Sequence, residues 1–335
     1  MKGIKIKLPA GLDNLHYVDL GEAPDPGPDE IQVRIQGSSL NYHDYSVVKG
    51  FMNPAEGRIP LSDGAGVITA IGDNVSEFAV GDRVVSCFFP DWQDGPPLVA
   101  DFARTPGDGI DGYAREKVTK PAHWFTHAPE GYNAIEAASL TTAGLTAWRS
   151  LVVHGNLKAG DTVLVLGTGG VSIFSLLFAK AMGARVFATS SSEEKIKRLQ
   201  ELGAEQTLNY KQDPEWGKTV LDWTDGRGVD HIIEVGGPAT LPQSIMAGRI
   251  GAHIHLMGVL TGIKGDIPTA MFMRKQMKMQ GMIVGNRRHQ QEMIRGINAT
   301  GVKPIIDKVF PLEELADAFR YEEAGSHFSK IGVSI

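Results

Sequence analysis

The chain has 335 residues, of which 42% are hydrophobic and 21% charged, and its formal net charge is −6. This composition is typical of a globular protein with a sizeable core, and the acidic balance gives no indication of a nucleic-acid-binding surface. The sequence shows no secretory leader and no apolar run long enough to cross a bilayer, so we expect a cytoplasmic protein without a membrane segment. A single cysteine, Cys87, excludes an internal disulfide and a zinc site made of four cysteines.

Residues 1–127 are predicted to be mostly β-structure. The segment 30–35 alternates apolar and polar residues with the period of a strand, and several short apolar runs separated by glycine follow it. Residues 91–112 are rich in Gly, Pro and Asp, which predicts a long loop. The aromatic residues Trp92, Phe102 and Tyr113 either form an apolar lid or pin this loop to the body of the protein.

Strands and helices alternate after a helical segment at residues 129–153. The expected strands are 162–166, 185–189, 206–209, 228–235, 252–257 and 279–284. Alternation of this kind predicts an α/β fold with a parallel, doubly wound sheet.

A glycine turn connects the first of these strands, 162–166, to the helix that follows it. The apolar run 162–166 is followed by Gly167, Thr168, Gly169, Gly170 and Val171, and then by an amphipathic helix. Glycine permits the tight turn and lets the backbone approach a phosphate, while the free N–H groups and the dipole of the helix attract negative charge. The turn therefore predicts a dinucleotide-binding site, although Ser172 replaces the third glycine of the usual fingerprint.

The end of the strand 185–189 predicts which dinucleotide binds. An NAD site needs an acidic residue there, about 20 residues after the fingerprint. Three serines occupy the place instead, and the first acid is Glu193. Hydroxyls donate to a 2′-phosphate, so we expect NADPH rather than NADH, with the serines also free to cap the next helix. The residues expected around the 2′-phosphate are Ser190, Ser191, Lys195 and Tyr210.

The sequence resembles the medium-chain dehydrogenase/reductase superfamily over essentially its whole length. The matching segments are 64–67, 80–84, 142–148, 167–171, 202–204 and 329–331. The resemblance implies a GroES-like, β-rich catalytic domain (residues 1–127 with 269–335) and a Rossmann NADP(H)-binding domain (residues 128–268). It also implies a homodimer, because members of the family commonly pair through the edge of the Rossmann sheet.

The resemblance is to members of the family that lack zinc, such as the quinone oxidoreductases. The three zinc-ligand positions of the zinc members hold Asn41, Ser62 and Thr142, none of which is a good zinc ligand. We therefore expect no catalytic metal, with His43 and His123 as the nearest alternative ligands. The run 284–288 also resembles bacterial members labelled zinc-type alcohol dehydrogenases, a label that fits poorly with the missing ligands.

The resemblance also implies positions at the cofactor. Asn41 corresponds to an Asn beside the nicotinamide, Thr142 to a residue near its ribose, and Lys330 to a lysine of the C-terminal tail near the cofactor. Residues at strand ends are expected to line the cofactor cleft as well. These are Gly236, Val259, Val284, Gly285 and Asn286.

The expected chemistry follows from the missing Lewis acid. Quinones and α,β-unsaturated carbonyl compounds are already electrophilic and need positioning, a hydrogen bond and a proton. The expected catalytic residues are Asn41, His43, Asp44 and Tyr45. His43 is either a general acid or, like Asp44, a residue that holds its loop by hydrogen bonds.

We therefore predict a zinc-independent, NADPH-dependent oxidoreductase that reduces a quinone or an α,β-unsaturated carbonyl compound. One alternative is a metal-free NAD(P)-dependent alcohol dehydrogenase or carbonyl reductase. The other belongs to a different class, an NADPH-binding protein with a structural or sensing role.

Overall fold

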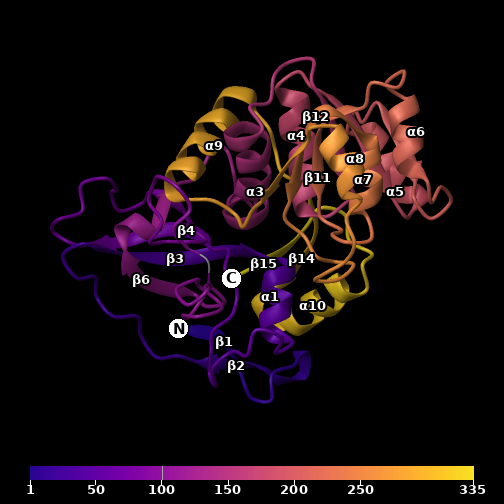
Figure 1. The fold of residues 1–335 in the computed structure, drawn as a ribbon. Coiled ribbons are helices and arrows are strands. Elements are labelled where there is room, and N and C mark those ends of the chain that lie inside the picture. Colours follow the sequence, from indigo (N-terminus) through magenta and orange to yellow (C-terminus); the bar gives the residue numbers. More distant parts are fainter. Residues whose placement is uncertain (100) are drawn as a thin grey trace. The chain divides into compact units, whose positions relative to one another are not determined.

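The computed structural model describes residues 1–99 and 101–335, and their contacts divide into two compact units (Figure 1). The first unit comprises residues 1–145 and 284–335, and the second comprises residues 146–283. The second unit is thus one continuous stretch of chain inserted into the sequence of the first.

A seven-stranded sheet forms the framework of the first unit. Its strands are β14 (Ile306–Pro311), β15 (Lys330–Ser334), β3 (Glu30–Ser39), β4 (Ala65–Ile71), β5 (Arg83–Ser86) and β7 (Phe125–His127) in that order, with β6 (Lys117–Pro121) paired to β3. The predicted alternation in β3 holds, because Ile31, Val33 and Ile35 are at most 1% exposed. A separate antiparallel pair consists of β1 (Lys2–Ile6) and β2 (Leu15–Asp19).

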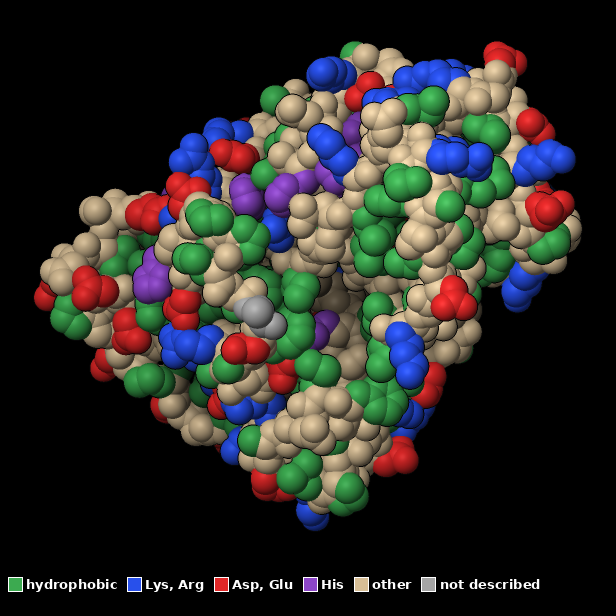
Figure 2. All heavy atoms as spheres, in the orientation of Figure 1, with side chains coloured by type: hydrophobic (Ala, Val, Ile, Leu, Met, Phe, Trp, Pro, Cys, Tyr) green, Lys and Arg blue, Asp and Glu red, His purple; other side chains and the backbone are tan. Residues whose placement is uncertain are grey.

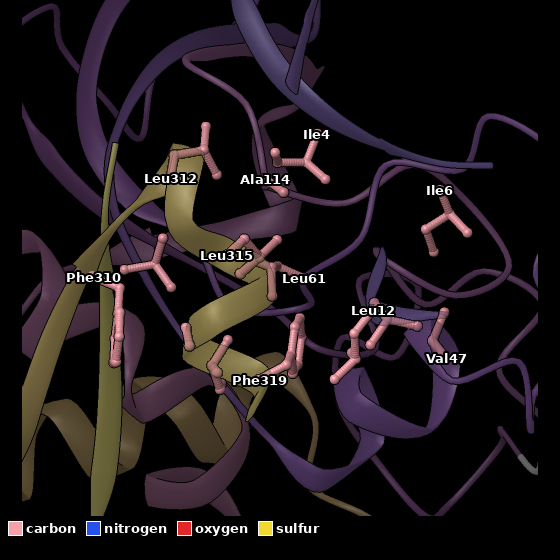
Figure 3. Packing of buried hydrophobic residues seen from close by; sticks show 14 of the residues in the cluster. Ile4, Ile6, Leu12, Val47, Leu61, Ala114, Phe310, Leu312, Leu315 and Phe319 are labelled. Atoms are coloured by element: carbon pink, nitrogen blue, oxygen red, sulfur yellow. The ribbon is translucent and has the colours of Figure 1, made fainter. Parts of the chain in front are cut away.

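The core of the first unit combines both ends of the chain. Its helices are α1 (Tyr42–Val48), α2 (Ala134–Ala138), α9 (Arg287–Thr300) and α10 (Leu315–Glu323). Side chains from the N-terminal region, such as Ile4 and Leu12, belong to one buried cluster with Phe310, Leu315 and Phe319 (Figure 3). Burial of such side chains contributes about 1.5–3 kcal/mol each, so the first unit depends on its C-terminal segment.

A six-stranded parallel sheet forms the second unit. Its strands are β10 (Gln206–Asn209), β9 (Arg185–Ser190), β8 (Thr162–Leu166), β11 (Val229–Glu234), β12 (Gly248–Leu256) and β13 (Lys278–Gly281) in that order. The helices of the unit are α4 (Gly170–Ala181), α5 (Glu193–Glu201), α6 (Trp216–Asp222), α7 (Leu241–Ala247) and α8 (Thr269–Arg274). The chain order reverses at β8, which pairs with both β9 and β11. The predicted doubly wound α/β sheet is confirmed, and ligands of such sheets bind where the order reverses.

Three segments differ in detail from the sequence predictions. The helical segment after α2 contains wide π-turns at Leu140–Gly144 and Arg149–His154 on either side of α3 (Leu145–Trp148). The last strand of the parallel sheet is Lys278–Gly281 rather than 279–284. By contacts, residues 128–145 join the first unit, because α2 packs against β3, β4, β5 and β15, and residues 269–283 join the second, because β13 pairs with β12.

Three further observations concern surface charge, helix length and the single cysteine. On the face shown in Figure 2, basic and acidic side chains are intermixed, with no large patch of one sign. No helix among the described residues combines the length and the apolarity that a membrane span requires. Cys87 is 2% exposed, and burial raises the pKa of its thiol to about 12, so it behaves as a small apolar residue.

Candidate active site

The predicted glycine turn joins β8 to α4 in the second unit. Gly167 has a φ angle of 73°, in the left-handed region that favours glycine. Gly169 is the N-cap residue of α4, and a Cβ added at Gly167 or Gly169 would meet no atom within 4 Å. The hydroxyl of Ser172 donates to the carbonyl of Leu166 at 2.7 Å, so serine at the third fingerprint position ties the helix to the strand.

The chain leaves open space beside the N-cap of α4. At φ −75° the backbone of Gly169 suits any residue, and no atom of the described chain would lie within 4 Å of a Cβ there. What glycine provides at this position is therefore close access to the N–H groups at the start of α4. The other predicted residues of the turn, Thr168, Gly170 and Val171, complete it and form the first residues of the helix.

One serine at the end of β9 forms the helix cap that the sequence allowed. Ser190 ends the strand, and its Oγ accepts from the N–H of Ser192 at 3.3 Å. The Oγ of Ser192 accepts from the N–H of Lys195 at 3.4 Å and so caps α5. Tyr210 comes beside this strand end because its N–H donates to the carbonyl of Ser190 at 3.0 Å. In these bonds the hydroxyls of Ser190 and Ser192 act as acceptors, and Ser191 lies between them in the sequence.

A turn after β11 depends on a residue that the sequence analysis did not single out. Glu234 is 0% exposed, and its Oε1 accepts from the N–H groups of Gly236 and Gly237 at 2.9 Å each and from the hydroxyl of Thr240 at 2.6 Å. Its Oε2 accepts from the hydroxyl of Ser244 at 2.5 Å. The sequence pattern that could have identified Glu234 is a carboxylate at the end of a buried strand, shortly before two glycines. Glu234 holds predicted Gly236 at the carboxyl end of the sheet.

The remaining predicted strand-end residues lie in different settings. Val259 follows β12 in the second unit and is 53% exposed. Val284, Gly285 and Asn286 begin the last segment of the first unit and are buried. The side chain of Asn286 accepts from the N–H of His289 at 2.8 Å, so its evident role is to cap α9.

Five polar side chains of the first unit form one connected group, which we call the polar cluster: Asn41, Asp44, Asp63, Thr142 and Lys330. The hydroxyl of Thr142 donates to Asp63 Oδ1 at 2.7 Å, and Lys330 Nζ donates to Asn41 Oδ1 at 2.6 Å. Asn41 Nδ2 donates to Asp44 Oδ2 at 3.0 Å. Except for Thr142, which is half-buried, the members are at most 8% exposed. The structure thus brings together residues that the sequence analysis assigned separately.

The two carboxyl groups of the polar cluster are held by backbone and hydroxyl donors. Asp44 Oδ1 accepts from the N–H of Ser62 at 2.8 Å, and Oδ2 accepts from the N–H of Asn41 at 3.1 Å. Asp63 Oδ2 accepts from the hydroxyl of Ser39 at 2.6 Å. Burial and then the charge of Asp63 raise the pKa of Asp44, while its hydrogen bonds and His43 oppose that shift. Asp44 therefore orients Asn41 and the start of α1.

Lys330 brings a positive charge into the polar cluster from the C-terminal strand. It is 2% exposed at the first position of β15, and its Nζ also donates to the carbonyl of Leu40. The same Nζ lies 3.6 Å from Asp63 Oδ2. Because lysine has donors only, the Asn41 amide oxygen must face Lys330, and the amide nitrogen is left to face Asp44.

His43 lies next to the loop 91–112 and not within the hydrogen bonds of the polar cluster. Its Nε2 is 3.2 Å from Asp108 Oδ2, within the distance of an ion pair but without the direction of a hydrogen bond. Its ring lies 4.4 Å from that of Phe102 and 5.5 Å from that of Phe88, measured between centroids. The loop thus supplies both a carboxylate and an aromatic wall to His43.

The aromatic residues of this loop settle the alternatives left by the sequence. Trp92 is 2% exposed and Tyr113 is 0% exposed. Phe102 packs against Phe88 and Phe89, with ring centroids 6.2 Å apart in each case. These side chains pin the described part of the loop to the first unit.

Two other predicted residues lie apart from the polar cluster. The hydroxyl of Tyr45 donates to Glu323 Oε1 at 2.7 Å, and burial followed by this hydrogen bond raises the pKa of Tyr45. Lys49 Nζ also reaches Glu323, at 3.0 Å. Tyr45 is therefore engaged with α10, and exposed His123 does not join Asn41 either.

Comparisons with known proteins add an independent line of argument. A family model described as the alcohol dehydrogenase GroES-like domain matches residues 27–130, and one described as zinc-binding dehydrogenase matches residues 170–299. A zinc-type alcohol dehydrogenase-like protein of Schizosaccharomyces pombe is 37% identical over 97% of this chain and 96% of its own length.

Solved structures resemble the chain over its whole length. A putative alcohol dehydrogenase from Sinorhizobium meliloti 1021 has a TM-score of 0.93 and 36% identity, with coverage of 100% of this chain and 99% of its own. A quinone oxidoreductase from Pseudomonas syringae pv. Tomato DC3000 has a TM-score of 0.82 and 25% identity, with coverage of 100% and 99%. These relatives share one fold and carry names from two chemical classes.

Proposed function

Because the chain belongs to the medium-chain dehydrogenase/reductase superfamily of NAD(P)-dependent oxidoreductases, we propose that it is a zinc-independent member that uses NADPH to reduce a quinone or an α,β-unsaturated carbonyl compound. The observation that carries this proposal is the ammonium group of Lys330 inside the polar cluster. The Lys330 ammonium group argues against a catalytic zinc ion. The glycine turn and the serines at the end of β9 support NADPH as the cofactor.

The residues of the polar cluster do not fit a zinc ion. The ligand positions hold the neutral side chains of Asn41, Ser62 and Thr142. Asn41 Oδ1 already accepts from Lys330, and both oxygens of Asp63 accept from hydroxyl groups. Zinc prefers thiolate, imidazole and free carboxylate ligands, and a dication here would face a fixed cation. We therefore assign no step of the reaction to a metal.

The second unit fits a nicotinamide dinucleotide with a 2′-phosphate. The open space at Gly169 suits the pyrophosphate, and Ser190, Ser191, Lys195 and Tyr210 surround the end of β9 without a carboxylate among them. Replacing Lys195 with Ala is expected to weaken NADPH binding much more than NADH binding, as measured by titration of each cofactor. Equal losses for the two cofactors would contradict the assignment of the 2′-phosphate site.

The polar cluster can stabilise the negative charge that develops on an acceptor oxygen. Bound NADPH supplies the hydride. Lys330 and Asp44 hold the amide of Asn41 from its two sides, and the second hydrogen on Nδ2 has no acceptor among the described residues. We assign this N–H to the acceptor oxygen, because a preorganised donor costs no reorganisation during the reaction.

His43 is the proton donor that the geometry favours over Tyr45. Asp108 lies 3.2 Å from His43 Nε2 and can hold a protonated ring in place, which leaves the Nδ1 hydrogen for transfer. The hydroxyl of Tyr45, by contrast, is engaged by Glu323. The whole reaction consumes one hydride and one proton and gives the saturated carbonyl compound or the hydroquinone.

A second candidate function is metal-free reduction of a simple carbonyl group, with the reverse oxidation of an alcohol. The names of the Schizosaccharomyces pombe and Sinorhizobium meliloti relatives favour it. In this case Asn41 and Lys330 replace the Lewis acid that polarises a carbonyl in zinc enzymes.

The decisive experiment measures NADPH consumption with cinnamaldehyde in the presence of a chelator, followed by identification of the product. The saturated aldehyde supports the proposed reduction of the conjugated double bond. Cinnamyl alcohol contradicts it and supports metal-free carbonyl reduction. Activity that the chelator abolishes and Zn²⁺ restores would contradict zinc independence in both forms.

We also propose that the protein is a homodimer that pairs through β13. This strand lies at the edge of the parallel sheet, and all four of its residues are exposed, including Met279 at 36%. An uncovered edge strand is a template for pairing with a second copy. Light scattering after size exclusion should give the mass of two chains, and the variant Met279→Lys should shift it towards one.

A further inference from the structure

Three histidines gather on one face of the parallel sheet in the second unit. His253 and His255 alternate along β12 and so point to the same side, and His231 on β11 is the register partner of His253. One nitrogen from each ring lies within 4.8 Å of the other two. We call this group the histidine trio. Neither the glycine turn nor the polar cluster includes it.

The rings of the trio are packed closely. The centroids of the His253 and His255 rings are 4.0 Å apart, and those of His231 and His255 are 5.6 Å apart. His255 is 0% exposed, and its Nδ1 has no hydrogen-bond partner among the described residues. A buried imidazole nitrogen without a partner is available as a metal ligand.

The distance between two of the nitrogens is compatible with metal ligation. His231 Nδ1 and His255 Nε2 are 3.4 Å apart, at the long end for a hydrogen bond. Two imidazole nitrogens on a tetrahedral Zn²⁺ at about 2.05 Å lie about 3.3 Å from each other. His253 is the half-buried member, so its side chain has room to bring the third nitrogen closer.

Asp161 orients His231 as carboxylates orient metal-binding histidines. Its Oδ2 lies 3.4 Å from His231 Nε2, on the side of the ring away from His255. A proton on Nε2 therefore faces the carboxylate and leaves the Nδ1 lone pair directed towards His255. This is the arrangement of carboxylate, histidine and metal found in many metal sites.

The surrounding charges nearly balance. Lys278 on β13 is the register partner of His253, and Arg249 lies near His231, but Arg249 and Arg227 are both bonded to Asp230. Asp161 adds one negative charge to the trio. A fourth histidine, His154, lies nearby, and its Nε2 accepts from Arg149 Nε at 3.0 Å, which leaves it outside the trio.

We propose that His231, His253 and His255 form a site for one divalent transition-metal cation, with Zn²⁺ as the best fit, that joins β11 to β12. Three imidazoles supply the protein ligands, and a water molecule completes the tetrahedron. The site is separate from the polar cluster, so the proposal stands whether or not the proposed reaction does.

The test is a titration of the full-length, chelator-treated protein with ZnCl₂ by calorimetry, and with CoCl₂ by visible absorption. We expect one Zn²⁺ per chain, the d–d bands of tetrahedral Co²⁺, and a rise in Tm when Zn²⁺ is added. His253→Ala should weaken Zn²⁺ binding by more than about 100-fold, and Asp161→Asn by about 10–100-fold. Because His253 is half-buried, its truncation leaves the fold intact.

The matched control is His154→Gln, which removes a neighbouring imidazole outside the trio and should titrate like the wild type. His255→Asn provides a second removal of a ligand. Failure of the wild type to bind Zn²⁺ would overturn the proposal. So would a stoichiometry and an affinity that stay unchanged in both His253→Ala and His255→Asn.

Discussion

The glycine turn of the second unit and the polar cluster of the first show two opposite ways to build a site. At the turn, the chain leaves space: a side chain at Gly169 would meet nothing within 4 Å. In the polar cluster, the chain fills the space: Lys330, Asn41 and Asp63 are at most 8% exposed and are bonded to their own neighbours. The turn leaves room for the proposed cofactor, whereas the cluster contains its own cation.

This difference determines whether a substitution at each site alters ligand affinity or protein stability. Changes at the turn should alter ligand affinity and leave folding intact, because the chain makes no contact there. Changes in the cluster should alter folding first, because a buried charge that loses its partner is costly. The predictions below test this separation.

The largest effect is expected for Lys330→Met. It leaves the buried carboxylate of Asp63 without its nearby cation, so the free energy of unfolding should fall by about 3–5 kcal/mol. Urea unfolding measures this, with the exposed Lys5→Met as a neutral control. The double variant Lys330→Met/Asp63→Asn should regain part of the loss. A loss below 1 kcal/mol for Lys330→Met would show that the cluster does not depend on its cation.

A substitution at Glu322, a residue close enough to Lys330 and Asp44 to feel their charges, tests whether a further negative charge beside the polar cluster is destabilising. Burial raises its pKa to about 8, and Lys330 only partly opposes the shift. Its contribution to stability is therefore present below its ordinary pKa and is lost as the pH rises through 8. Glu322→Gln should match the wild type at pH 5 and exceed it at pH 9 by on the order of 3 kcal/mol.

Urea unfolding at the two pH values measures the effect of Glu322→Gln. The neighbouring exposed residue supplies the control, because hydrogen bonds to Tyr45 and Lys49 lower the pKa of Glu323. Glu323→Gln should show no gain at pH 9. A gain for Glu322→Gln that is the same at pH 5 and pH 9 would mean that ionisation is not its cause.

Gly169→Asp tests the glycine turn, where we expect a loss of cofactor affinity without a loss of stability. Aspartate is a good N-cap residue, so Tm should stay the same or rise, but its side chain fills the space of the pyrophosphate and repels it. NADPH affinity should fall more than about 100-fold, which is about 2.7 kcal/mol. Gly169→Asn has the same size without the charge and should lose less. NADPH binding at wild-type strength in Gly169→Asp would place the cofactor elsewhere.

The smallest effect is expected for Asn286→Ala. The side chain caps α9, so its loss should cost about 1 kcal/mol of stability, measured by urea unfolding. The sequence also predicted Asn286 as a cofactor residue. If the cap is its only role, NADPH affinity will not change, whereas a tenfold loss of affinity would support the cofactor role.

The sequence predicted the parts of the protein that depend on local pattern. The family and the doubly wound sheet are confirmed, because periodicity and glycine turns are encoded by neighbouring residues. The glycine turn was likewise predictable, since Gly167 and Gly169 lie two residues apart on one strand-to-helix connection.

The polar cluster was not predictable as a unit. The contact between Lys330 and Asn41 joins residues that are 289 positions apart, and it exists because β15 pairs with β3. The roles of Glu234 and of the histidine trio also depend on neighbouring strands rather than on local pattern. For the same reason the sequence did not show that Tyr45 turns towards Glu323.

The pairing of β15 with β3 has a consequence for biosynthesis. The second unit is one continuous stretch, so it can fold on the ribosome as soon as residues 146–283 have emerged. The first unit must wait, because Lys330 and the strand that carries it follow the second unit in the chain. Asp63 is therefore made early and stays without its cation until β15 has been translated. The nascent chain thus holds a finished glycine turn before it holds a finished polar cluster.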